Sequence, residues 1–449
     1  MSEQPVEFYG IVEGGYPNIP YAGDRPKKTA YVDLPNSHYD PIHGQRVLET
    51  QLELLASMER FGLDGAGFTE QHNGPIGSVP NALMAAAWLA ARTDRIKLLV
   101  NGPLMNAYQS PVRLAEEIAL ADVLSKGRLL VGLPIGLGAQ YHSLGMNPAT
   151  ARERHAEGHD LLVKALTEPG PFEWHGKYFD HNYVNIWPRP AHPIEFNLPG
   201  GGSLETLELA AKRRYTYQTV LNERRAMIAV MNRFRDLCRG EGYEPDPKQC
   251  AVVVEIHVAE TDAEARRECE AGILWNYQNY FEAPLHDKFP PGYTSAKSYR
   301  GITGSGFSLD TKSMTYDDLV DNNWLVAGSP ETVTAKLQEL IADTGAGRLF
   351  LGFSMGIKHR WLVEKCLTIF SEQVLPHFRP NGRPLWAEPE AEQHGYRSAL
   401  EYATKRKADV PTPSFVQGGY LRDVRTAHLD GVDERIRPYP AAETNHDAS

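Results

Sequence analysis

Glu70 and His72 stand on either side of Gln71, directly after a short stretch, Gly65–Thr69, that has the composition of a β-strand. Successive side chains of an extended chain point to opposite faces, so Glu70 and His72 share one face. A carboxylate beside an imidazole can fix its tautomer and serve acid–base chemistry. The same pair also occurs as a structural contact beneath a loop, so the residues leave both interpretations open.

A run of glycines between Gly200 and Gly202 follows a predicted strand, Ile194–Leu198, and opens a predicted helix. Glycine lets the backbone approach an anion closely, and the free N–H groups and dipole at the start of a helix favour phosphate. The hydroxyls of Ser203 and Thr206 add hydrogen-bond donors. The alternative is an ordinary tight turn in which Ser203 is the N-cap.

Arg152 and Arg154 lie in the first turn of a predicted amphipathic helix, Ala151–Leu166. An arginine binds phosphate through two parallel hydrogen bonds, although a surface ion pair at the helix end explains these two residues equally simply. His155 and His159 have the i, i+4 spacing of helical metal ligands. No third ligand is evident, and catalytic zinc needs three protein ligands. We therefore predict a packing or surface role for both histidines, and no metal.

Asn101, Gly102 and Pro103 directly follow a predicted buried strand, Ile96–Val100. A cis bond before Pro103 would let the backbone lie flat against a planar ring. Only about one X–Pro bond in twenty is cis, so these residues alone give no support for it.

A long segment, Glu282–Asn323, is rich in Gly, Pro, Ser and Tyr and lacks periodicity. Long loops in compact domains are often functional. Aromatic residues precede it or lie within it, and they either line a lid over an apolar substrate or pack a long excursion. These aromatic residues are Trp275, Tyr277, Tyr280, Phe281, Phe289, Tyr293 and Tyr299.

The residues named so far sit between strands and helices that alternate along the chain, which implies a parallel sheet with its site at the carboxyl ends of the strands. We count eight strand–helix units, which close naturally into a (β/α)8 barrel. An open doubly wound sheet is less favoured because no GxGxxG opens the first helix. The predicted strands are Glu7–Val12, Gly65–Thr69, Ile96–Val100, Leu129–Gly132, Ile194–Leu198, Tyr215–Leu221, Cys250–Ala259 and Arg348–Ser354.

Helical periodicity marks further segments between these strands. The predicted helices include Gln45–Phe61, Pro80–Arg92, Pro111–Ser125, Glu223–Gly240, Asp262–Tyr280, Glu331–Ala342 and His359–Leu375, with Ser329 as the cap and Pro330 as the first residue of the penultimate one. Pro171–Trp187 reads as an inserted surface hairpin. We divide the chain into a barrel, 1–380, with a lid-like insertion at 282–323, and a C-terminal extension, 381–449. The extension contains a short helix near Glu392–Lys407 and packs on the barrel or on a neighbouring subunit.

Composition narrows the class of protein. With 42% hydrophobic and 23% charged residues among 449, the chain has an ordinary globular composition. The net charge of -11 argues against a nucleic-acid partner, which requires a basic footprint. No apolar run is long enough to cross a membrane, and the N-terminus lacks the pattern of a secretory signal. Four scattered cysteines without CxxC spacing fit a reducing cytoplasm.

Several motifs occur together and in order. They are TEQH after the second strand, PVRLAEEIALADVLSKGRLLVGLPIG, ATARERHAEGHDLL, WPRPAHPIEFNLPGGGSLETLELAAKR, LVAGSPETVTAKLQELIADTGAGRLFLGFSMG and VLPHFRP. The segment Phe68–Gly136 in particular resembles the bacterial luciferase-like flavin-dependent monooxygenase family, and the resemblance extends over roughly Glu7–Pro380. Several motifs recur in register, so the resemblance is specific for the family but not for a substrate.

The resemblance implies a (β/α)8 barrel that binds FMN at the carboxyl ends of its strands. Reduced FMN would come from a separate NAD(P)H:flavin reductase and react with O2 to a C4a-peroxyflavin, which oxidises a small, mostly apolar organic substrate. A homodimer is also implied. In family terms Gly200, Gly202, Ser203 and Thr206 match the phosphate-binding turn, and Arg152 matches a phosphate-contacting arginine. Gly102 and Pro103 match the site of an unusual cis peptide beneath the isoalloxazine. We place Glu70, His72 and Asn101 near the ring as candidate catalytic residues.

The chain departs from the family pattern at two places. The luciferases carry Glu-His-His where this chain has Glu70, Gln71 and His72, so their catalytic histidine corresponds to Gln71. A second phosphate-contacting arginine falls near Ile135, and the adjoining cysteine position is Pro134. Luciferase chemistry itself is therefore not expected, and phosphate affinity rests more on the glycine turn.

Other functions stay open. A related barrel uses the deazaflavin F420 for hydride transfer without oxygen, and a non-catalytic flavin-binding protein would hold FMN in either redox state. A flavin-free metal hydrolase is disfavoured, because such barrels commonly begin with two histidines one residue apart and this chain has no HxH.

Overall fold

The structure is a computed structural model that describes residues 5–13, 15–20, 30, 34–220, 222–296, 299–300, 311–354 and 358–385. All of them belong to the first of the two units into which the chain divides, Met1–Ala403, whereas the second unit, Thr404–Ser449, lies outside the described residues. The helix predicted near Glu392–Lys407 and nearly all of the predicted extension lie outside them too.

Eight parallel strands close into a barrel, in the order β1, β2, β3, β4, β7, β8, β9 and β11, with β11 pairing back to β1. The predicted (β/α)8 barrel is therefore confirmed, and the open sheet is excluded because β8 pairs with β9 at Tyr217 and Cys250. Each strand falls within two residues of its predicted bounds. The strands are β1 Glu7–Ile11, β2 Gly65–Thr69, β3 Lys97–Asn101, β4 Leu129–Gly132, β7 Glu195–Gly200, β8 Thr216–Thr219, β9 Cys250–Val258 and β11 Arg348–Gly352.

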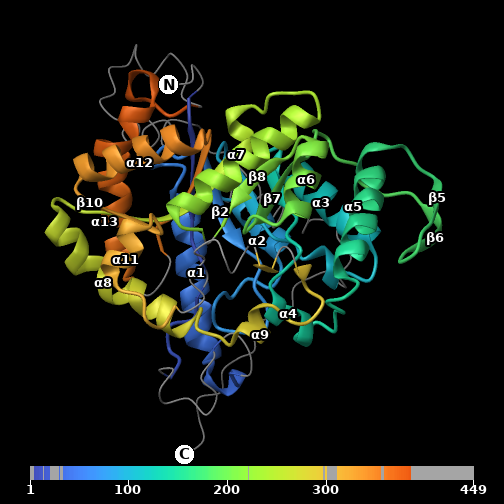
Figure 1. Ribbon diagram of the computed structural model, residues 1–449, viewed down its shortest axis with the longest axis horizontal. Helices are drawn as coiled ribbons and strands as arrows, with labels where there is room; N and C mark the ends of the chain where they lie inside the picture. The colour runs from blue at the N-terminus through green and yellow to red at the C-terminus, as the bar shows by residue number, and fades with distance from the viewer. Residues whose placement is uncertain are drawn as a thin grey trace, which may run out of the picture. The chain divides into compact units, whose positions relative to one another are not determined.

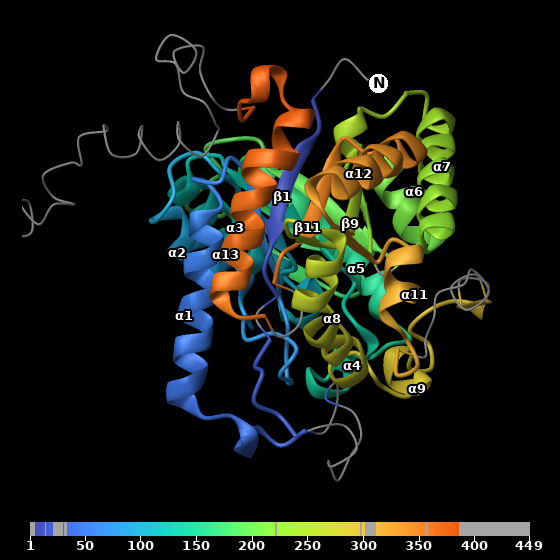
Figure 2. The same ribbon diagram turned by 90° about the vertical axis from the view of Figure 1, so that its left-hand side faces the viewer.

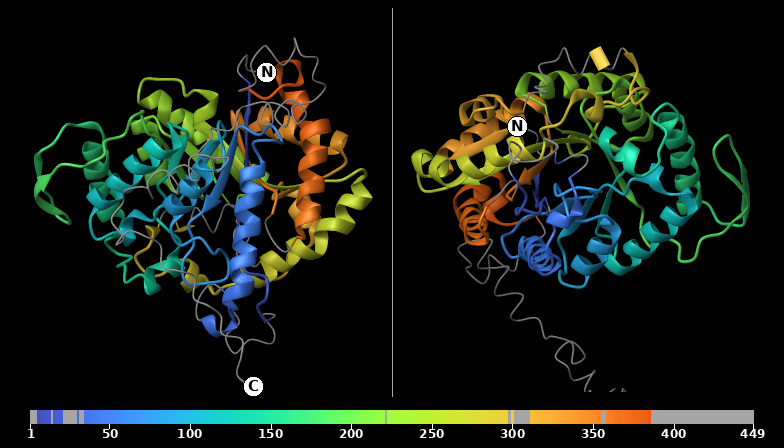
Figure 3. Two further views of the ribbon diagram at one scale, coloured as in Figure 1. Left: turned by 180° about the vertical axis from the view of Figure 1, so that it is seen from behind. Right: turned by 90° about the horizontal axis from the view of Figure 1, so that it is seen from below.

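Helices follow the strands and form an outer ring around the barrel (Figure 3, right). The last helix returns to the first, so that α13 lies beside α1 (Figure 2). The helices of this ring are α1 Pro41–Ser57, α2 Ala82–Ala90, α3 Pro111–Ser125, α5 Ala151–Thr167, α6 Leu204–Arg213, α7 Arg224–Gly240, α8 Asp262–Asn279, α12 Pro330–Thr344 and α13 Arg360–Ile369.

Helix starts follow the capping residues. In α12, Ser329 accepts a hydrogen bond from the N–H of Thr332 with Pro330 at the first position, as predicted. The first helix was predicted from Gln45 but begins four residues earlier, because the side chain of Asp40 accepts hydrogen bonds from two N–H groups of the first turn and a proline follows it.

Two elements lie in or next to the segment that was expected to be aperiodic. The short helix α11 (Tyr316–Asp321) is capped by Thr315, and it leads into a ninth strand, β10 (Leu325–Gly328), that the sequence did not predict. This strand pairs with the second half of β9, from Glu255 to Val258, where β9 continues beyond the closed part of the barrel. Four apolar residues between a long loop and a helix start give no clear periodic signal.

The interior of the barrel is layered. At the amino ends of the strands, Arg348 is buried and forms ion pairs with Glu7 and Glu195. Burial opposes ionisation of Glu7, but the charge of Arg348 and of nearby lysines holds its pKa at about 2. An apolar layer follows, formed by residues such as Tyr9 and Phe350. Polar side chains take over only toward the carboxyl ends of the strands.

Two insertions complete the described part. The strands β5 (Phe172–His175) and β6 (Asp180–Val184) form the predicted antiparallel hairpin, which stands away from the helix ring at the right of Figure 1. Residues 282–296, here called the strap, include the short helix α9 (Leu285–Lys288). The strap packs against α4 (Gly138–Ser143), where the carbonyl of Lys288 fills the space a side chain at Gly138 would need.

Candidate active site

A cavity of about 280 Å³ opens at the carboxyl ends of the barrel strands, which is the edge at which the sequence placed the site. Residues from seven strand ends and from the strap line it. They are Ile11, Glu13, Thr69, Glu70, Gln71, Asn101, Gly102, Leu104, Pro134, Ile135, Gly136, Leu137, Gln140, Arg152, Pro199, Gly200, Gly201, Ser203, Thr206, Gln218, Val220, Val253, Phe281, Phe289 and Tyr293. Of the predicted site residues, seven line the cavity, whereas His72, Pro103 and Gly202 do not.

The glycine turn between β7 and α6 forms one end of the cavity. Ser203 stands at the N-cap of α6 but makes no capping bond, because its hydroxyl pairs with that of Thr206 at 2.8 Å. The start of the helix therefore lacks a side-chain cap, which leaves it suited to an anion. Gly202 has a φ of +100°, and its N–H donates to the hydroxyl of Tyr217, so it shapes the turn rather than facing the cavity.

Arg152 reaches the same end of the cavity from the first turn of α5. Its guanidinium donates to the carbonyl of Tyr293 and to the hydroxyl of Thr294, both at 3.3 Å, and lies 3.9 Å from the carboxylate of Glu205. Arg154 points elsewhere, donating to the carbonyl of Tyr108. Of the two arginines singled out by the sequence, only Arg152 thus lines the cavity.

The wall beneath the mouth of the cavity is built from amides. Asn197 donates both to the side-chain oxygen of Asn101 and to that of Gln218. The remaining amide atoms, Oδ1 of Asn197 and Nε2 of Gln218, are buried without a partner among the described residues. Unpaired buried amide atoms are costly unless a ligand completes them. Gln218 lines the cavity, so an acceptor atom on a bound ligand could complete its Nε2, whereas Asn197 lies behind the lining residues.

Glu70 and His72 are in contact, with Nε2 of His72 3.1 Å from Oε1 of Glu70. The carboxylate also accepts the N–H of Leu104 at 2.8 Å and that of Ala82, the first residue of α2, at 3.1 Å. It therefore ties the connection between β2 and α2 to the loop after β3, at the wall of the cavity. Gln71 lines the cavity beside Glu70.

The peptide bond between Gly102 and Pro103 is trans, and so is the bond between Asn101 and Gly102. The cis peptide that the resemblance implied at this site is therefore wrong for this chain. Gly102 instead takes a φ of +146° and lies close enough to Glu70 that a Cβ would stand 2.7 Å from its Cβ. The backbone turns here through a conformation open to glycine, and proline keeps its usual trans form.

Glu13 is a candidate that the sequence analysis overlooked. It lies two residues after Ile11, on the same face of the chain as that residue, and both line the cavity. Burial raises the pKa of its carboxyl to about 7, although the hydroxyl of Thr69 donates to Oε2 at 2.8 Å. The sequence did contain a signal for this residue, because an acidic side chain stands two positions after the end of a strand. The two glycines that follow Glu13 instead indicated the start of a loop.

The histidine pair of α5 is buried. His159 packs edge-on against Tyr215 and Phe196, and neither of its ring nitrogens has a hydrogen-bond partner in the described part of the chain. Within those described ranges, no three His, Cys, Asp or Glu side chains are placed to hold a metal ion. The pair is therefore a packing element between α5 and the barrel.

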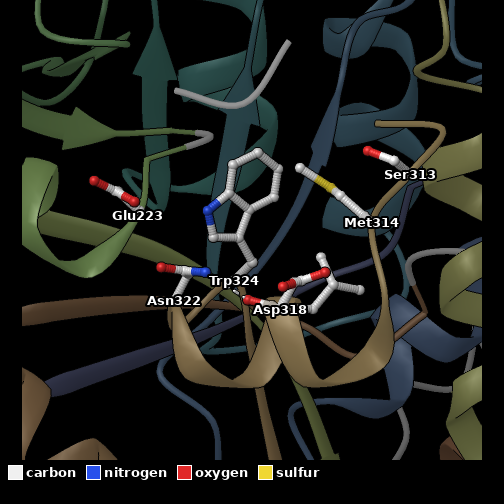
Figure 4. Close-up of a pocket in the computed structure, with 7 residues that line it drawn as sticks. Glu223, Ser313, Met314, Asp318, Asn322 and Trp324 are labelled. Atoms are coloured by element: carbon white, nitrogen blue, oxygen red, sulfur yellow. Dashed lines mark hydrogen bonds between the residues drawn. The ribbon is translucent and has the colours of Figure 1, made fainter. Parts of the chain in front are cut away.

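A second cavity, of about 270 Å³, lies outside the barrel between the start of α7, helix α11 and the residue before β10 (Figure 4). Glu223, Asn322 and Trp324 contribute to its wall. Asp318 also lines it, but its carboxylate is taken up in capping α11, where it accepts from the N–H and hydroxyl of Thr315. None of the predicted site residues reaches this cavity.

Fold and cavity together define a (β/α)8 barrel whose cavity lies at the carboxyl edge and combines an uncapped helix start and an arginine with amide side chains in its wall. The family model described as luciferase-like monooxygenase matches residues 29–348, and the chain belongs to this family. The family inferred from the sequence motifs is thus confirmed.

Relatives of known activity are distant but extensive. The chain is 26% identical to 2,5-diketocamphane 1,2-monooxygenase 2 of Pseudomonas putida over 322 residues, which is 67% of this chain and 85% of the relative. It is 25% identical to limonene 1,2-monooxygenase of Rhodococcus erythropolis over 344 residues, covering 74% and 81%.

Solved structures share the fold. The oxygenating constituent of 3,6-diketocamphane monooxygenase from Pseudomonas putida, a type II Baeyer–Villiger monooxygenase solved with FMN, matches with a TM-score of 0.62 at 21% identity, covering 83% of this chain and 99% of that one. An F420-dependent secondary alcohol dehydrogenase matches with a TM-score of 0.59 at 14% identity, covering 84% and 100%.

Proposed function

We propose that this chain is an FMN-dependent monooxygenase that takes reduced FMN from a separate NAD(P)H:flavin reductase and uses O2 to oxidise a small, mostly apolar organic compound. The observation that carries the proposal is the cavity itself. It joins an uncapped helix start and Arg152 at one end to the amide wall of Asn101 and Gln218 in the middle, in a chain of the luciferase-like monooxygenase family.

The residues present fit FMN. The phosphate would meet the start of α6, the hydroxyls of Ser203 and Thr206, and Arg152. The ring would meet the unpaired Nε2 of Gln218, which lines the cavity. When bound, reduced FMN supplies the electrons with which oxygen is activated. The part of this chain is to orient the ring and the substrate against each other.

Exclusion of water falls to the strap. Phe281, Phe289 and Tyr293 line the cavity from this side, and the hydroxyl of Tyr293 donates to the carbonyl of Gly136 at 2.7 Å. A closed apolar cover strengthens every polar interaction beneath it and protects a reactive site from water. The apolar lining also favours an organic substrate with few charges. The predicted lid, 282–323, lies partly outside the described residues, so we propose this covering role for residues 282–296 alone.

Three side chains near the ring have different proposed tasks. Asn101 is part of the amide wall and orients the ring. Glu70 positions the loops that carry Gln71 and Leu104. His72 acts in proton transfer through its contact with Glu70, because it does not itself line the cavity.

The first experiment is rapid mixing of the protein, loaded anaerobically with reduced FMN, against oxygenated buffer in the presence of 2,5-diketocamphane or limonene as probes. We expect oxidised FMN to reappear more slowly than from free reduced FMN, and one probe to yield an oxygenated product. Reoxidation at the rate of free flavin, with no product from either probe, would refute the proposal.

Two alternatives have separate outcomes. An F420-dependent oxidoreductase shares the fold; it would bind F420 more tightly than FMN and would transfer hydride equally well without air. A non-catalytic flavin-binding protein would hold oxidised and reduced FMN alike and would turn over no probe. Equilibrium binding of oxidised FMN, reduced FMN and F420, together with the turnover of the probes, decides among these functions.

We also propose that the protein is a homodimer in the cytoplasm. Its four cysteines are free, buried thiols, which suits a reducing compartment. In the described ranges, no helix has both the length and the apolar composition needed to cross a membrane. Large apolar side chains are exposed on the neighbouring helices α2 and α3, and a second copy of the chain would cover them. The domain division at 380 remains a prediction.

A further inference from the structure

A continuous row of hydrogen bonds, here called the amide row, links side chains along one wall of the cavity. The N–H of Leu137 donates to Oε1 of Gln140 at 3.1 Å. Nε2 of Gln140 donates to Oε1 of Gln71 at 3.4 Å, and Nε2 of Gln71 donates to the hydroxyl of Thr69 at 3.2 Å. That hydroxyl donates to Oε2 of Glu13 at 2.8 Å. All five residues line the cavity, so the whole row is within reach of a ligand.

The direction of the row is fixed from its two ends. A backbone N–H can only donate, so the amide atom of Gln140 that faces Leu137 is its oxygen, and the NH2 group of Gln140 faces Gln71. Gln71 must then turn its oxygen toward Gln140 and its NH2 group toward Thr69. The hydroxyl of Thr69 accepts from this group and gives its one proton to the carboxyl of Glu13, which ends the row as an acceptor.

Each of the two amides keeps one N–H that the row does not use. An amide nitrogen carries two hydrogens, and Nε2 of Gln71 and Nε2 of Gln140 each spend one of them on the next member of the row. Within the described part of the chain, neither nitrogen makes a second hydrogen bond. Gln140 is only 6% exposed. A donor buried in this way is costly unless it meets an acceptor, so a ligand oxygen would complete it.

Gln71 is held in place by its surroundings as well as by the row. Its backbone N–H donates to the carbonyl of Val79 at 3.1 Å. Its side chain packs over Gly77, where an added Cβ would stand 2.6 Å from Cγ of Gln71. Donors that are fixed before a ligand arrives lose little conformational freedom when they bind it, which favours selective recognition.

The charge around the row indicates which acceptor it suits. In the closed barrel three strands separate β1 from β7 on either side, so Glu13 after β1 lies across from the glycine turn after β7. Among the described residues that line the cavity, only Arg152 carries a positive charge, and it lies at the glycine turn. An anionic group would therefore be repelled by Glu13 and left without a cation. A carbonyl oxygen is uncharged and has two lone pairs, so it can accept two N–H donors.

We propose that Gln71 and Gln140 bind the carbonyl oxygen of an uncharged organic ligand, and that Glu13 is the positioning residue that keeps both amides in this orientation. In the proposed function this ligand is the substrate, so the naming of a carbonyl compound as the substrate rests on that function. Binding of a carbonyl compound does not rest on it, because the amide row is complete without flavin.

The first test follows the carbonyl group itself. The full chain without flavin is titrated with 2,5-diketocamphane, and the ketone C=O stretch is recorded by infrared difference spectroscopy. A hydrogen-bonded C=O group absorbs at lower frequency, so at least one stretch of the bound probe should lie below its value in an apolar solvent. Gln71→Met and Gln140→Met should reduce this shift. Each should also raise the Kd of the probe, measured by calorimetry, by about 3- to 10-fold, which is the effect of one neutral hydrogen bond.

Gln45→Met is the matched control, because Gln45 is exposed on α1 and bonds to Glu49 of the same helix. It should leave the shift and the Kd unchanged. In the wild type, failure of the probe to bind, or a bound probe whose C=O stretches keep their values in an apolar solvent, would overturn the proposal. This result needs no variant, so it holds even where a substitution prevents folding, as judged by circular dichroism.

Two substitutions of Glu13 test the positioning role. Glu13→Gln still offers an oxygen to the hydroxyl of Thr69, so the probe should bind with the wild-type shift. Glu13→Leu removes this acceptor and frees the hydroxyl of Thr69 to turn toward Gln71, so the shift should become smaller. An equal shift in both variants would show that Glu13 does not position the amides.

The affinity for oxidised FMN separates the proposed ligand from the proposed cofactor. Gln71→Met and Gln140→Met should keep the wild-type Kd for FMN. A weaker Kd for FMN with an unchanged ketone shift would assign the two amides to the flavin and overturn the proposal. With reduced FMN and O2, the diketone should be oxidised in preference to limonene, which has no oxygen atom. If neither compound reacts, the proposed function fails while the infrared result still stands.

Discussion

Nε of Arg152 lies 3.3 Å from the backbone carbonyl oxygen of Tyr293, so the arginine proposed to bind phosphate also holds the strap. Tyr293 in turn donates its hydroxyl to the carbonyl of Gly136 at 2.7 Å. One side chain thus joins the anion-binding end of the cavity to its cover. A phosphate bound at Arg152 would therefore meet the same guanidinium group that holds the strap.

Arg152→Ala should weaken FMN binding and loosen the strap together. Loss of one charge-assisted contact corresponds to about 1.5–3 kcal/mol, or roughly 10- to 100-fold in the Kd for FMN. Hydrogen exchange at residues 285–295 should become faster in the free protein. Calorimetric titration with FMN and exchange measured by mass spectrometry provide the two readouts.

Arg154→Ala is the matched control, because Arg154 occupies the same helical turn but contacts Tyr108 and the ring of Phe179 instead. Its affinity for FMN and the exchange of its strap should equal those of the wild type. If Arg152→Ala changed neither quantity, or if both variants changed them equally, the arginine would have no special place at the phosphate end.

His72→Ala should lower turnover of a substrate while sparing FMN binding. The imidazole touches Glu70 but does not line the cavity, so its removal leaves the phosphate end and the amide wall intact. We expect a fall in kcat of about 100-fold if His72 takes part in proton transfer. Unchanged turnover would remove His72 from the mechanism.

Glu70→Gln distinguishes a catalytic from a structural role for the neighbouring carboxylate. The N–H groups of Ala82 and Leu104 both donate to it, and an amide offers only one acceptor oxygen. We therefore expect a lower free energy of unfolding, by about 1–3 kcal/mol. Urea denaturation measures this loss, and His72→Ala should show much less of it.

The barrel was accessible from the sequence because buried parallel strands are short apolar runs and helices carry a 3.6-residue period. The predicted start of α1 was wrong because a capping residue, not the apolar pattern, sets it. Asp40 and the proline after it begin the helix before its first periodic apolar residue. The strand β10 was missed because its four residues pair only with the extension of β9. That pairing is a long-range contact which no local pattern encodes.

The site was accessible only where a motif carried it. The glycine turn and Arg152 could be placed from the sequence, since helix starts and strand ends meet at one edge. Glu13 was not, because its place in the cavity depends on the path of the backbone beyond the end of β1. The bond before Pro103 is trans in this chain, so the resemblance to the family did not predict it correctly.

His155 and His159 should make the fold sensitive to acid. Burial, followed by the neighbouring positive charge, lowers the pKa of His155 to about 3 and that of His159 to about 4. The unfolded chain binds these protons first, near the ordinary histidine pKa of about 6.5. Stability is therefore fully present above about pH 6.5 and falls as the pH drops toward the folded values.

His159→Phe should remove one of these protons while filling the space between Tyr215 and Phe196. The pH dependence of the unfolding free energy between about pH 6 and 4.5 should become shallower by roughly 1.4 kcal/mol per pH unit. His286→Phe, at an exposed histidine, should leave that slope unchanged. Equal slopes for all three proteins, measured by denaturant titration at several pH values, would show that His159 is not a proton-linked group.

The proposed dimer has an identifiable surface on α2 and α3. Met84 on α2 is 73% exposed, and Leu120, Val123 and Leu124 lie exposed on α3. The two helices contact each other, so these exposed side chains lie on neighbouring helices of the outer ring. Burying them against a second copy would remove from water a patch that is costly on a monomer.

Met84→Glu combined with Leu124→Glu should convert the protein to a monomer. Two unpaired carboxylates buried in the interface would weaken association by at least about 100-fold, since each loses its hydration without gaining a partner. Light scattering coupled to size-exclusion chromatography gives the mass. Trp361→Glu, an equally exposed apolar residue on α13, should leave the dimer intact. A monomeric wild type would show that the proposed dimer does not form. A dimer that survives the double substitution would place the subunit contact on another face, because the two new carboxylates lie on α2 and α3.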